Sequence, residues 1–302
     1  MRKQKYSVYY RSINAKLTKS ERGLFNLLLT RQNESGCVRG VYYRECCEIL
    51  QISYQGFYDS LHGLEKKGLL RTQKNDYYDI DVWILDNDFK DGDYADGYIN
   101  MSRAMYSDPE FLRLSAGAQI IATDAMRFDD TNHTTYRIGI KKLYNKYTEF
   151  LGVKRRSIKA YLEELRPFFS IGMRNGVCYI EPLSRAVRGL KGNRSETDKE
   201  TLHRHLVRVE CRRNRIKEAP EQVIRETADL FIQYGTEIQK WNEKHPYNRI
   251  TLPGVIKKSL QTINAKTKNV YKWIRTLRPA LVHKLLRNLL GLDRSMQIPI
   301  ID

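Results

Sequence analysis

Histidines and tyrosines are the side chains of this sequence that come closest to a catalytic pattern. His203 and His205 are separated by an arginine, whereas the metal site of tyrosine nicking enzymes has an apolar residue between its histidines. Residues 205–208 match the His-x-x-Arg element of a tyrosine recombinase, but a chain with 20 tyrosines and 53 basic residues contains such matches by coincidence. The sequence has no glycine-rich phosphate-binding loop. We therefore expect no enzyme activity.

The cysteines and aspartates do not have the spacing of a metal site. Five cysteines occur, an odd number, and none has the Cys-x-x-Cys spacing of a zinc site. They are Cys37, Cys46, Cys47, Cys178 and Cys211. In the acidic segment 86–93, aligning Gly92 with the sixth position of a calcium loop puts Phe89 where an oxygen ligand is needed. We expect no disulfides, no metal, no other cofactor and a reduced, cytoplasmic setting.

Two groups of polar side chains have the chemistry to contact double-stranded DNA. The first group is Tyr54, Gln55, Tyr58 and His62. The second group is Arg155, Arg156 and Lys159. In the major groove, an amide such as that of Gln55 pairs with adenine, and the guanidinium groups of Arg155 and Arg156 pair with guanine. We expect Tyr54 and Tyr58 to touch phosphates or a thymine methyl group.

Both groups lie in a segment that repeats along the chain. Residues 50–64 and 151–165 superpose at an offset of 101, and their apolar residues recur with the period of one helix face. These residues are Phe57, Leu61 and Leu64 in the first copy, and Ile158, Leu162 and Leu165 in the second. Ser53 is a good N-cap, whereas Lys154 is a poor one that suits a phosphate. The pattern predicts two helix-turn-helix units, preceded by helices over 20–31 and 116–128.

A β-hairpin is expected after each helix-turn-helix. The first runs from residues 69–72 to 77–85, and the second from 170–174 to 177–180. The second turn is Asn175-Gly176, the strongest short hairpin signal, because both residues tolerate positive φ. Lys74 and Arg174 would lie at the hairpin tips, where they can enter a minor groove or meet phosphates. Helices followed by a hairpin in this order predict a winged helix.

The charge distribution favours a polyanionic partner. Lysine and arginine number 53 against 35 aspartates and glutamates, a net charge of +18 with a pI near 9.6. Such an excess indicates nucleic acid or an acidic membrane surface. The sequence has no secretory signal and no apolar run of the roughly 20 residues that span a bilayer, so we expect no membrane partner. Residues 76–96 hold eight aspartates and one lysine, and their part over 86–96 is predicted to be a solvated acidic linker.

The segment that enters the second repeat, residues 97–128, contains Phe111-Leu112-Arg113-Leu114-Ser115-Ala116-Gly117-Ala118. With the helix-turn-helix that follows, it resembles the N-terminal winged-helix domain of replication initiator A proteins of Gram-positive plasmids and integrative elements, over about residues 97–183. It is also loosely similar to tandem winged-helix plasmid initiators. The resemblance implies binding to origin DNA and recruitment of host replication proteins. In that family the domain usually opens the protein, whereas here another winged helix precedes it.

The last third of the chain reads as helical. A capping box at residues 195–198 predicts the start of a helix with one stripe of arginines, which either follows a DNA backbone or is simply solvated. The stripe is Arg204, Arg208, Arg212 and Arg215. Further helices are expected from Pro220 to His245, from Thr251 and from Pro279, with Gly291 as a C′ residue. This region suits self-association, as in a homodimer, or contact with a host replication protein.

Together these patterns predict a mainly α protein with small β-hairpins, of the α+β class. The expected domains are a first winged helix (1–85), an acidic linker (86–96), a second winged helix (97–188) and a helical C-terminal domain (189–302). The expected function is sequence-specific binding to double-stranded DNA by a replication initiator of a plasmid or mobile element. Two alternatives stay open: a transcriptional regulator of a phage or mobile element, and a protein-interaction scaffold.

Overall fold

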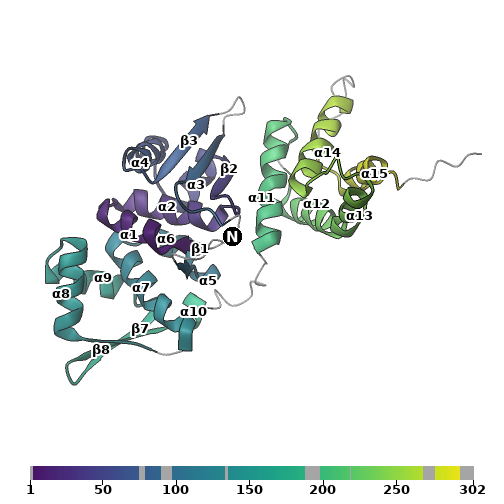
Figure 1. Cartoon of the computed structure of the whole chain (residues 1–302). Coiled ribbons are helices and arrows are strands. Elements are labelled where there is room, and N and C mark those ends of the chain that lie inside the picture. Colours follow the sequence, from purple (N-terminus) through teal and green to yellow (C-terminus); the bar gives the residue numbers. More distant parts are fainter. Residues whose placement is uncertain are drawn as a thin grey trace, which may run out of the picture. The chain divides into compact units, whose positions relative to one another are not determined.

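The computed structural model describes residues 3–74, 79–89, 97–132, 135–187, 198–217, 219–267 and 276–292. The chain forms two compact units, Met1–Ser195 and Glu196–Asp302 (Figure 1). Helices predominate, and the sheets are small and antiparallel. The expected mainly helical α+β composition is confirmed.

The N-terminal unit contains two halves that share the order helix, strand, two helices and two strands, which we call the first module (residues 6–89) and the second module (residues 98–187). The first module comprises α1 (Tyr6–Asn14), α2 (Lys19–Arg31), β2 (Cys37–Val41), α3 (Tyr43–Leu50), α4 (Tyr54–Lys66), β3 (Leu70–Lys74) and β4 (Ile80–Ile84). Its three strands are ordered β2-β4-β3, so the hairpin is extended by a strand from before α3.

The second module repeats this arrangement. It comprises β5 (Tyr98–Asn100), α5 (Arg103–Tyr106), α6 (Pro109–Leu112), α7 (Ala116–Asn132), β6 (Tyr136–Gly139), α8 (Ile140–Leu151), α9 (Arg155–Glu164), β7 (Phe169–Arg174), β8 (Val177–Pro182) and α10 (Ser184–Val187). The strand order β6-β8-β7 matches that of the first module. Strands β2 and β6 were not predicted, because each is short, pairs only with a hairpin strand about 40 residues away and has no local sequence signal of its own.

The repeated apolar faces of α4 and α9 point into the core, as the helical period predicts. All six of their apolar residues are at most 4% exposed. Each preceding turn contains a left-handed residue, Gln51 with φ 51° in the first module and Gly152 with φ 65° in the second. The Oγ of Ser53 accepts a hydrogen bond from the Gly56 amide at 3.0 Å, whereas the Lys154 side chain caps nothing. Both capping predictions are confirmed.

The second hairpin turn has the conformation that its sequence requires. Asn175 and Gly176 have φ of 50° and 75°, and the β7–β8 register closes on Arg174 opposite Val177. In the first hairpin, β3 ends at Lys74, and the tip predicted over 73–76 lies partly outside the described residues.

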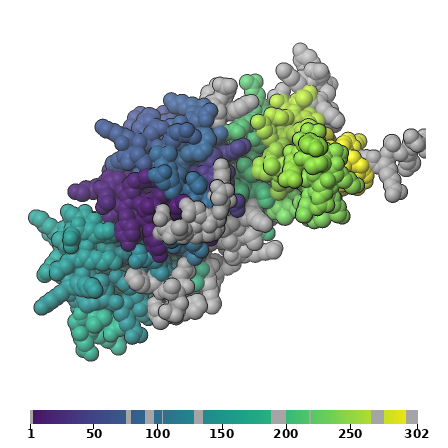
Figure 2. Space-filling model, viewed as in Figure 1, coloured from purple at the N-terminus to yellow at the C-terminus, as the bar shows by residue number. Residues whose placement is uncertain are grey.

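The two modules share one hydrophobic core and are fused. Strand β1 (Lys3–Lys5), from the N-terminus, pairs antiparallel with β5 of the second module, and α1 packs against α8. In Figure 2 the purple N-terminal segment accordingly lies between the blue first module and the teal second module. Gly23 of α2 is so close to α6 that a Cβ there would be 2.4 Å from the Leu112 carbonyl oxygen. The expected domains 1–85 and 97–188 thus lie within one compact unit.

Buried polar groups also join the modules. The hydroxyls of Tyr9 and Tyr147 donate to the Asp124 carboxylate at 3.0 and 3.1 Å, and Lys146 pairs with the same group at 2.8 Å. Within the first module, the Arg22 guanidinium donates to the hydroxyl and the carbonyl oxygen of Ser12, each at 2.9 Å. Burial lowers the pKa of Arg22 to about 10, which leaves the group charged at neutral pH. Since buried polar groups must keep their partners, the bond from Tyr9 to Asp124 helps to fix how the modules sit on each other.

The start of the expected acidic linker is folded. Asn87 is fully buried: its side-chain Oδ1 accepts from the Lys5 backbone amide at 2.8 Å, and its Nδ2 donates to Gln32 Oε1 at 2.8 Å. Phe89 is 3% exposed, and its backbone amide donates to the Glu34 carbonyl oxygen. The prediction of a solvated linker is therefore wrong for these residues, because they anchor β1. Residues 90–96 lie outside the described part of the chain.

The C-terminal unit is built from helices around its own core. They are α11 (Asp198–Arg213), α12 (Glu221–Gln233), α13 (Gly235–Lys244), α14 (Leu252–Thr267) and α15 (Pro279–Leu289). The single helix expected from Pro220 to His245 is divided, with Gly235, a poor helix former, starting the second piece. Gly291 has φ 64° and follows α15 as the predicted C′ residue. The capping box expected at 195–198 lies largely outside the described residues.

Candidate nucleic-acid interface

The first candidate surface is the outer face of α4. Tyr54 is 57% exposed, Gln55 and His62 are exposed, and Tyr58 is half-buried. The structure therefore brings all four expected residues to one side of the helix. The Gln55 amide nitrogen, however, donates to the Asp59 carboxylate one turn later, at 2.7 Å. A contact of this amide with adenine would first require that bond to break.

The tyrosines of α4 belong to a larger aromatic cluster. Tyr43, at the start of α3, lies 4.9 Å from Tyr54 and 6.4 Å from Tyr58, measured between ring centroids, and the Tyr54 and Tyr58 rings are 4.8 Å apart. Burial and a hydrogen bond with Tyr54 raise the pKa of Tyr58 to about 12. Tyr43 was not predicted to belong to this surface. It lies eleven residues before Tyr54, and the two rings come together only because the turn between α3 and α4 brings them side by side.

The second candidate surface is the outer face of α9. Arg155, Arg156 and Lys159 are all exposed, and the N-terminal turn of the helix contains no acidic residue. The positive end of the helix dipole adds to their charge, and no side chain caps the free amides of this turn. Near the other end, Glu163 is bonded to Arg166, which lowers the pKa of that carboxyl group and offsets its charge. The first turn of α9 is therefore a concentrated positive surface.

The loop and first turn that lead into α7 hold α9 in place. The backbone amide and hydroxyl of Ser115 donate to the Glu164 carboxylate at the end of α9, at 2.7 and 2.6 Å. Gly117 lies against Tyr161 of α9, and a Cβ there would be 2.2 Å from the ring. Both residues belong to the segment that carries the initiator resemblance. Their part in positioning α9 was not predicted, although the run of small residues at 115–118 was its signal.

A different contact holds α4. Glu21 of α2 is 6% exposed, accepts from the Lys67 ammonium at 2.6 Å, and completes a capping box with Thr18. Its carboxylate lies against Gly63 of α4, where a Cβ would be 2.2 Å away. In each module, then, a glycine allows a close contact, of α4 with α2 in the first module and of α9 with α7 in the second, and a carboxylate bonds the two segments.

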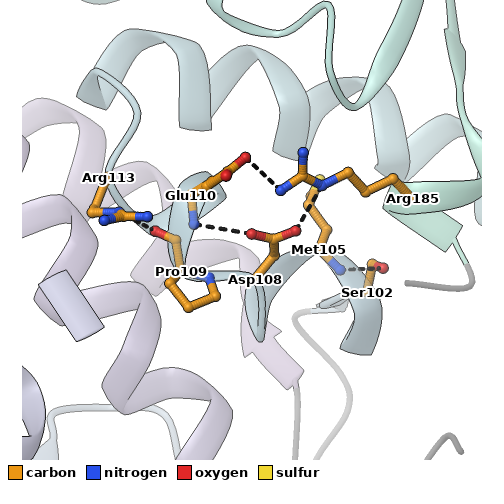
Figure 3. Close-up of polar contacts among 7 residues, drawn as sticks. All are labelled: Ser102, Met105, Asp108, Pro109, Glu110, Arg113 and Arg185. Carbon is orange, nitrogen blue, oxygen red and sulfur yellow. Dashed lines mark hydrogen bonds and ion pairs between the residues drawn. The ribbon is translucent and has the colours of Figure 1, made fainter. Parts of the chain in front are cut away.

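An arginine clamp joins the end of the second module to its beginning (Figure 3). Arg185 of α10 donates to Asp108 at 2.8 Å and to Glu110 at 2.5 Å, while Asp108 also caps α6. Ser102 caps α5 and donates to the Ala186 carbonyl oxygen at 2.5 Å. Figure 3 shows both carboxylates turned toward the guanidinium group. The strand β8 that leads into α10 is thereby tied to the start of the module.

The two hairpin residues are exposed, as expected. Arg174 ends β7 beside the turn, next to Met173, which is 46% exposed. Lys74 is the last residue of β3 and is also exposed. Both are therefore accessible to a nucleic-acid backbone.

The arginine stripe expected on α11 is not a uniformly exposed row. Arg204 and Arg208 both pair with Glu221 at the start of α12, and the Arg204 side chain is only 11% exposed. Arg212 is half-buried, and Arg215 is exposed but follows the helix in a left-handed conformation with φ 53°. The single outward stripe is a wrong prediction, because α12 covers part of that face.

The described part of the chain contains no cluster of three or more histidine, cysteine or carboxylate side chains placed to hold a metal ion, and its five cysteines are free. None of the described helices combines the length and apolar composition of a membrane span. Comparison with known proteins finds no family model, curated protein or solved structure that matches this chain.

Proposed function

We propose that the two modules are tandem winged helices and that the chain binds double-stranded DNA. The observation that carries this proposal is the outer face of α9, where three exposed cations surround an uncapped helix start on a helix-turn-helix frame. A helix of this kind fits the major groove with its N-terminal residues toward the bases. Arg155 and Arg156 are then the residues that contact guanine, and Lys159 contacts a phosphate.

The hairpins are the wings in this arrangement. Arg174 meets the minor groove or the phosphates beside the groove that α9 occupies, and Lys74 has the same role for the first module. Because one core and the β1–β5 pair join the modules, their helices keep a constant separation when they bind. DNA that contacts both modules is therefore held at two points of fixed spacing.

The biological role that we propose is initiation of replication on a plasmid or mobile element. The support is the similarity of residues 97–183 to initiator A proteins, together with a net charge of +18. The C-terminal unit then serves self-association or contact with a host replication protein in the cytoplasm. A transcriptional regulator would use the same DNA contacts. A protein-interaction scaffold would not bind DNA through either the α4 or the α9 surface.

Duplex binding is tested with the variant Arg155→Ala/Arg156→Ala/Lys159→Ala of the full chain. We expect a loss of affinity on the order of 100-fold, and a salt dependence shallower by about three charges, because each cation releases about one counterion. In the wild type, raising salt from about 50 to 200 mM is expected to cost on the order of 10³-fold in affinity.

A matched control removes the exposed cations Lys240, Lys257 and Lys258 of the C-terminal unit. If this control loses as much affinity as the α9 variant, the binding is diffuse and α9 has no special role. A flat salt response of the wild type contradicts DNA binding and favours the scaffold.

The initiator and the regulator are separated by cloning the coding region with its flanking DNA on a plasmid that lacks an origin. Autonomous replication supports the initiator. Repression of the gene's own promoter without replication supports the regulator.

A further inference from the structure

The outer surface of the first module is aromatic where the second is cationic. Tyr43, Tyr54 and Tyr58 form a triangle of rings with centroids 4.8 to 6.4 Å apart, and Tyr42 extends it, 5.2 Å from Tyr43. Tyr54 is 57% exposed, whereas large aromatic side chains usually lie mostly inside a protein. Exposed tyrosine rings of this kind are enriched at binding interfaces.

The surface is poorly suited to the phosphates of a duplex. Helix α4 contains Asp59 and Glu65 against the single cation Lys66, so its charge is opposite to that of a phosphate-binding helix. The amide of Gln55, the one side chain on this face suited to reading adenine, donates to Asp59. The electrostatic attraction that brings α9 to DNA is therefore missing here.

The same surface is suited to unpaired bases. An aromatic ring stacks on any base, because every base has a π face, and the interaction needs no hydrogen-bond pattern. Arg44 is exposed beside the cluster, with its Nε donating to the Tyr43 hydroxyl at 3.0 Å and its guanidinium 5.8 Å from that ring. It supplies a positive charge next to the rings, as a flexible single strand needs for its backbone.

We propose that the cluster of Tyr43, Tyr54 and Tyr58 binds single-stranded DNA by stacking with unpaired bases. This function goes beyond duplex recognition and does not depend on α9. Tyr54, the most exposed ring, makes the principal stacking contact, and Tyr43 and Tyr58 pack against it. The chain thus has one surface for the duplex and another for a strand that has been separated from it.

The test measures the affinity of the full chain for a fluorescein-labelled oligo-dT of about 16 nucleotides, which cannot form a duplex with itself. Fluorescence anisotropy is recorded for the wild type and for Tyr54→Ala, Tyr54→Phe and Tyr247→Ala. We expect Tyr54→Ala to weaken binding by about 5- to 150-fold, the loss of one stacked base. Tyr54→Phe keeps the ring and is expected to bind as the wild type does.

Tyr247→Ala is the matched control, because Tyr247 is 98% exposed and lies in the C-terminal unit. It is expected to leave the affinity unchanged. The proposal is overturned if the wild type does not bind oligo-dT, or if Tyr54→Ala binds it as well as the Tyr247→Ala control does. It is also overturned if Tyr54→Phe loses as much affinity as Tyr54→Ala, since the hydroxyl and not the ring would then be responsible. Each of these outcomes would instead favour a protein partner for the aromatic cluster.

The α9 variant distinguishes failure of this proposal from failure of duplex binding. Arg155→Ala/Arg156→Ala/Lys159→Ala is expected to lose duplex affinity on the order of 100-fold and to keep most of its affinity for oligo-dT. Tyr54→Ala is expected to show the reverse pattern. Because the four altered side chains are exposed, thermal unfolding should be nearly unchanged in both variants, and this is checked by circular dichroism.

Discussion

Helices α4 and α9 occupy the same place in their modules and present different chemistry to solvent. At the offset of 101 residues, Tyr54 corresponds to Arg155, Gln55 to Arg156 and Tyr58 to Lys159. The inward positions, by contrast, are apolar and buried in both helices. The core face therefore carries the shared fold, and the outer face is free to differ because packing does not constrain it.

A second difference lies at the starts of these helices. Ser53 satisfies the Gly56 amide in α4, whereas α9 begins after Lys154 with no side-chain cap. The uncapped start lowers the stability of the second module but keeps its amides and positive charge available to an anion. In α4 and α9, the amides at the helix start are either capped, which stabilises the helix, or remain available to bind an anion.

The largest expected effect tests the shared core. Phe57→Ala should reduce the free energy of unfolding of the N-terminal unit by about 3–5 kcal/mol, and Ile158→Ala by about 2–5 kcal/mol. Since the modules share one core, both variants should shift the same cooperative transition, as followed by urea denaturation with two spectroscopic probes. Two separate transitions would show that the modules unfold independently and would contradict the fusion.

The outer residues of α4 can be replaced by those of α9 to test whether they alone cause the difference. Tyr54→Arg/Gln55→Arg/Tyr58→Lys gives α4 the cations of α9. We expect its duplex affinity to rise by on the order of 100-fold at low salt, with a salt dependence steeper by about three charges. Its affinity for oligo-dT should lose the contribution of stacking and become strongly salt-dependent. Anisotropy titrations at several salt concentrations measure both, and an unchanged salt dependence would mean that α4 does not reach DNA.

The contact between the modules is probed by Gly23→Ala. Alanine normally stabilises a helix relative to glycine by about 1 kcal/mol, but here its Cβ would meet the Leu112 backbone. We therefore expect a loss of about 1–3 kcal/mol, as for overpacking of a core. Gly172→Ala is the control, because nothing lies within 4 Å of the added Cβ. A stabilised Gly23→Ala protein would show that α2 and α6 are not tightly apposed.

The smallest expected effects concern the two caps. Ser53→Ala should lower the unfolding free energy by about 1 kcal/mol, and Lys154→Ser should raise it by a similar amount. Lys154→Ser should also weaken duplex binding several-fold, because it removes a cation and occupies an amide at the helix start. Thermal unfolding and anisotropy give the two readouts. A Lys154→Ser protein that is more stable and binds duplex equally well would show that the uncapped helix start does not contribute to DNA binding.

Local patterns sufficed for much of the N-terminal unit. The helical period placed Leu61 and Leu162 inside, the Asn175-Gly176 pair specified its turn, and Ser53 and Lys154 were assigned correctly as a good and a poor cap. The exposure of Tyr54, Arg155 and the other outer residues followed from the same period. These properties depend on residues within one or two helical turns of each other, so the sequence alone contains them.

Tertiary structure decided what depends on distant residues. The pairing of β1 with β5 joins residues 3–5 to 98–100, and the burial of Asn87 depends on Lys5 and Gln32. Neither has a local signature, so the sequence suggested separate domains and a solvated linker where one core exists. The arginines of α11 were correctly predicted to lie on a helix, but the packing of α12 against it determines which of them are exposed. The hydrophobic period of a helix or strand determines which of its faces points inward. Which other segment packs on that face depends on contacts between residues far apart in the chain.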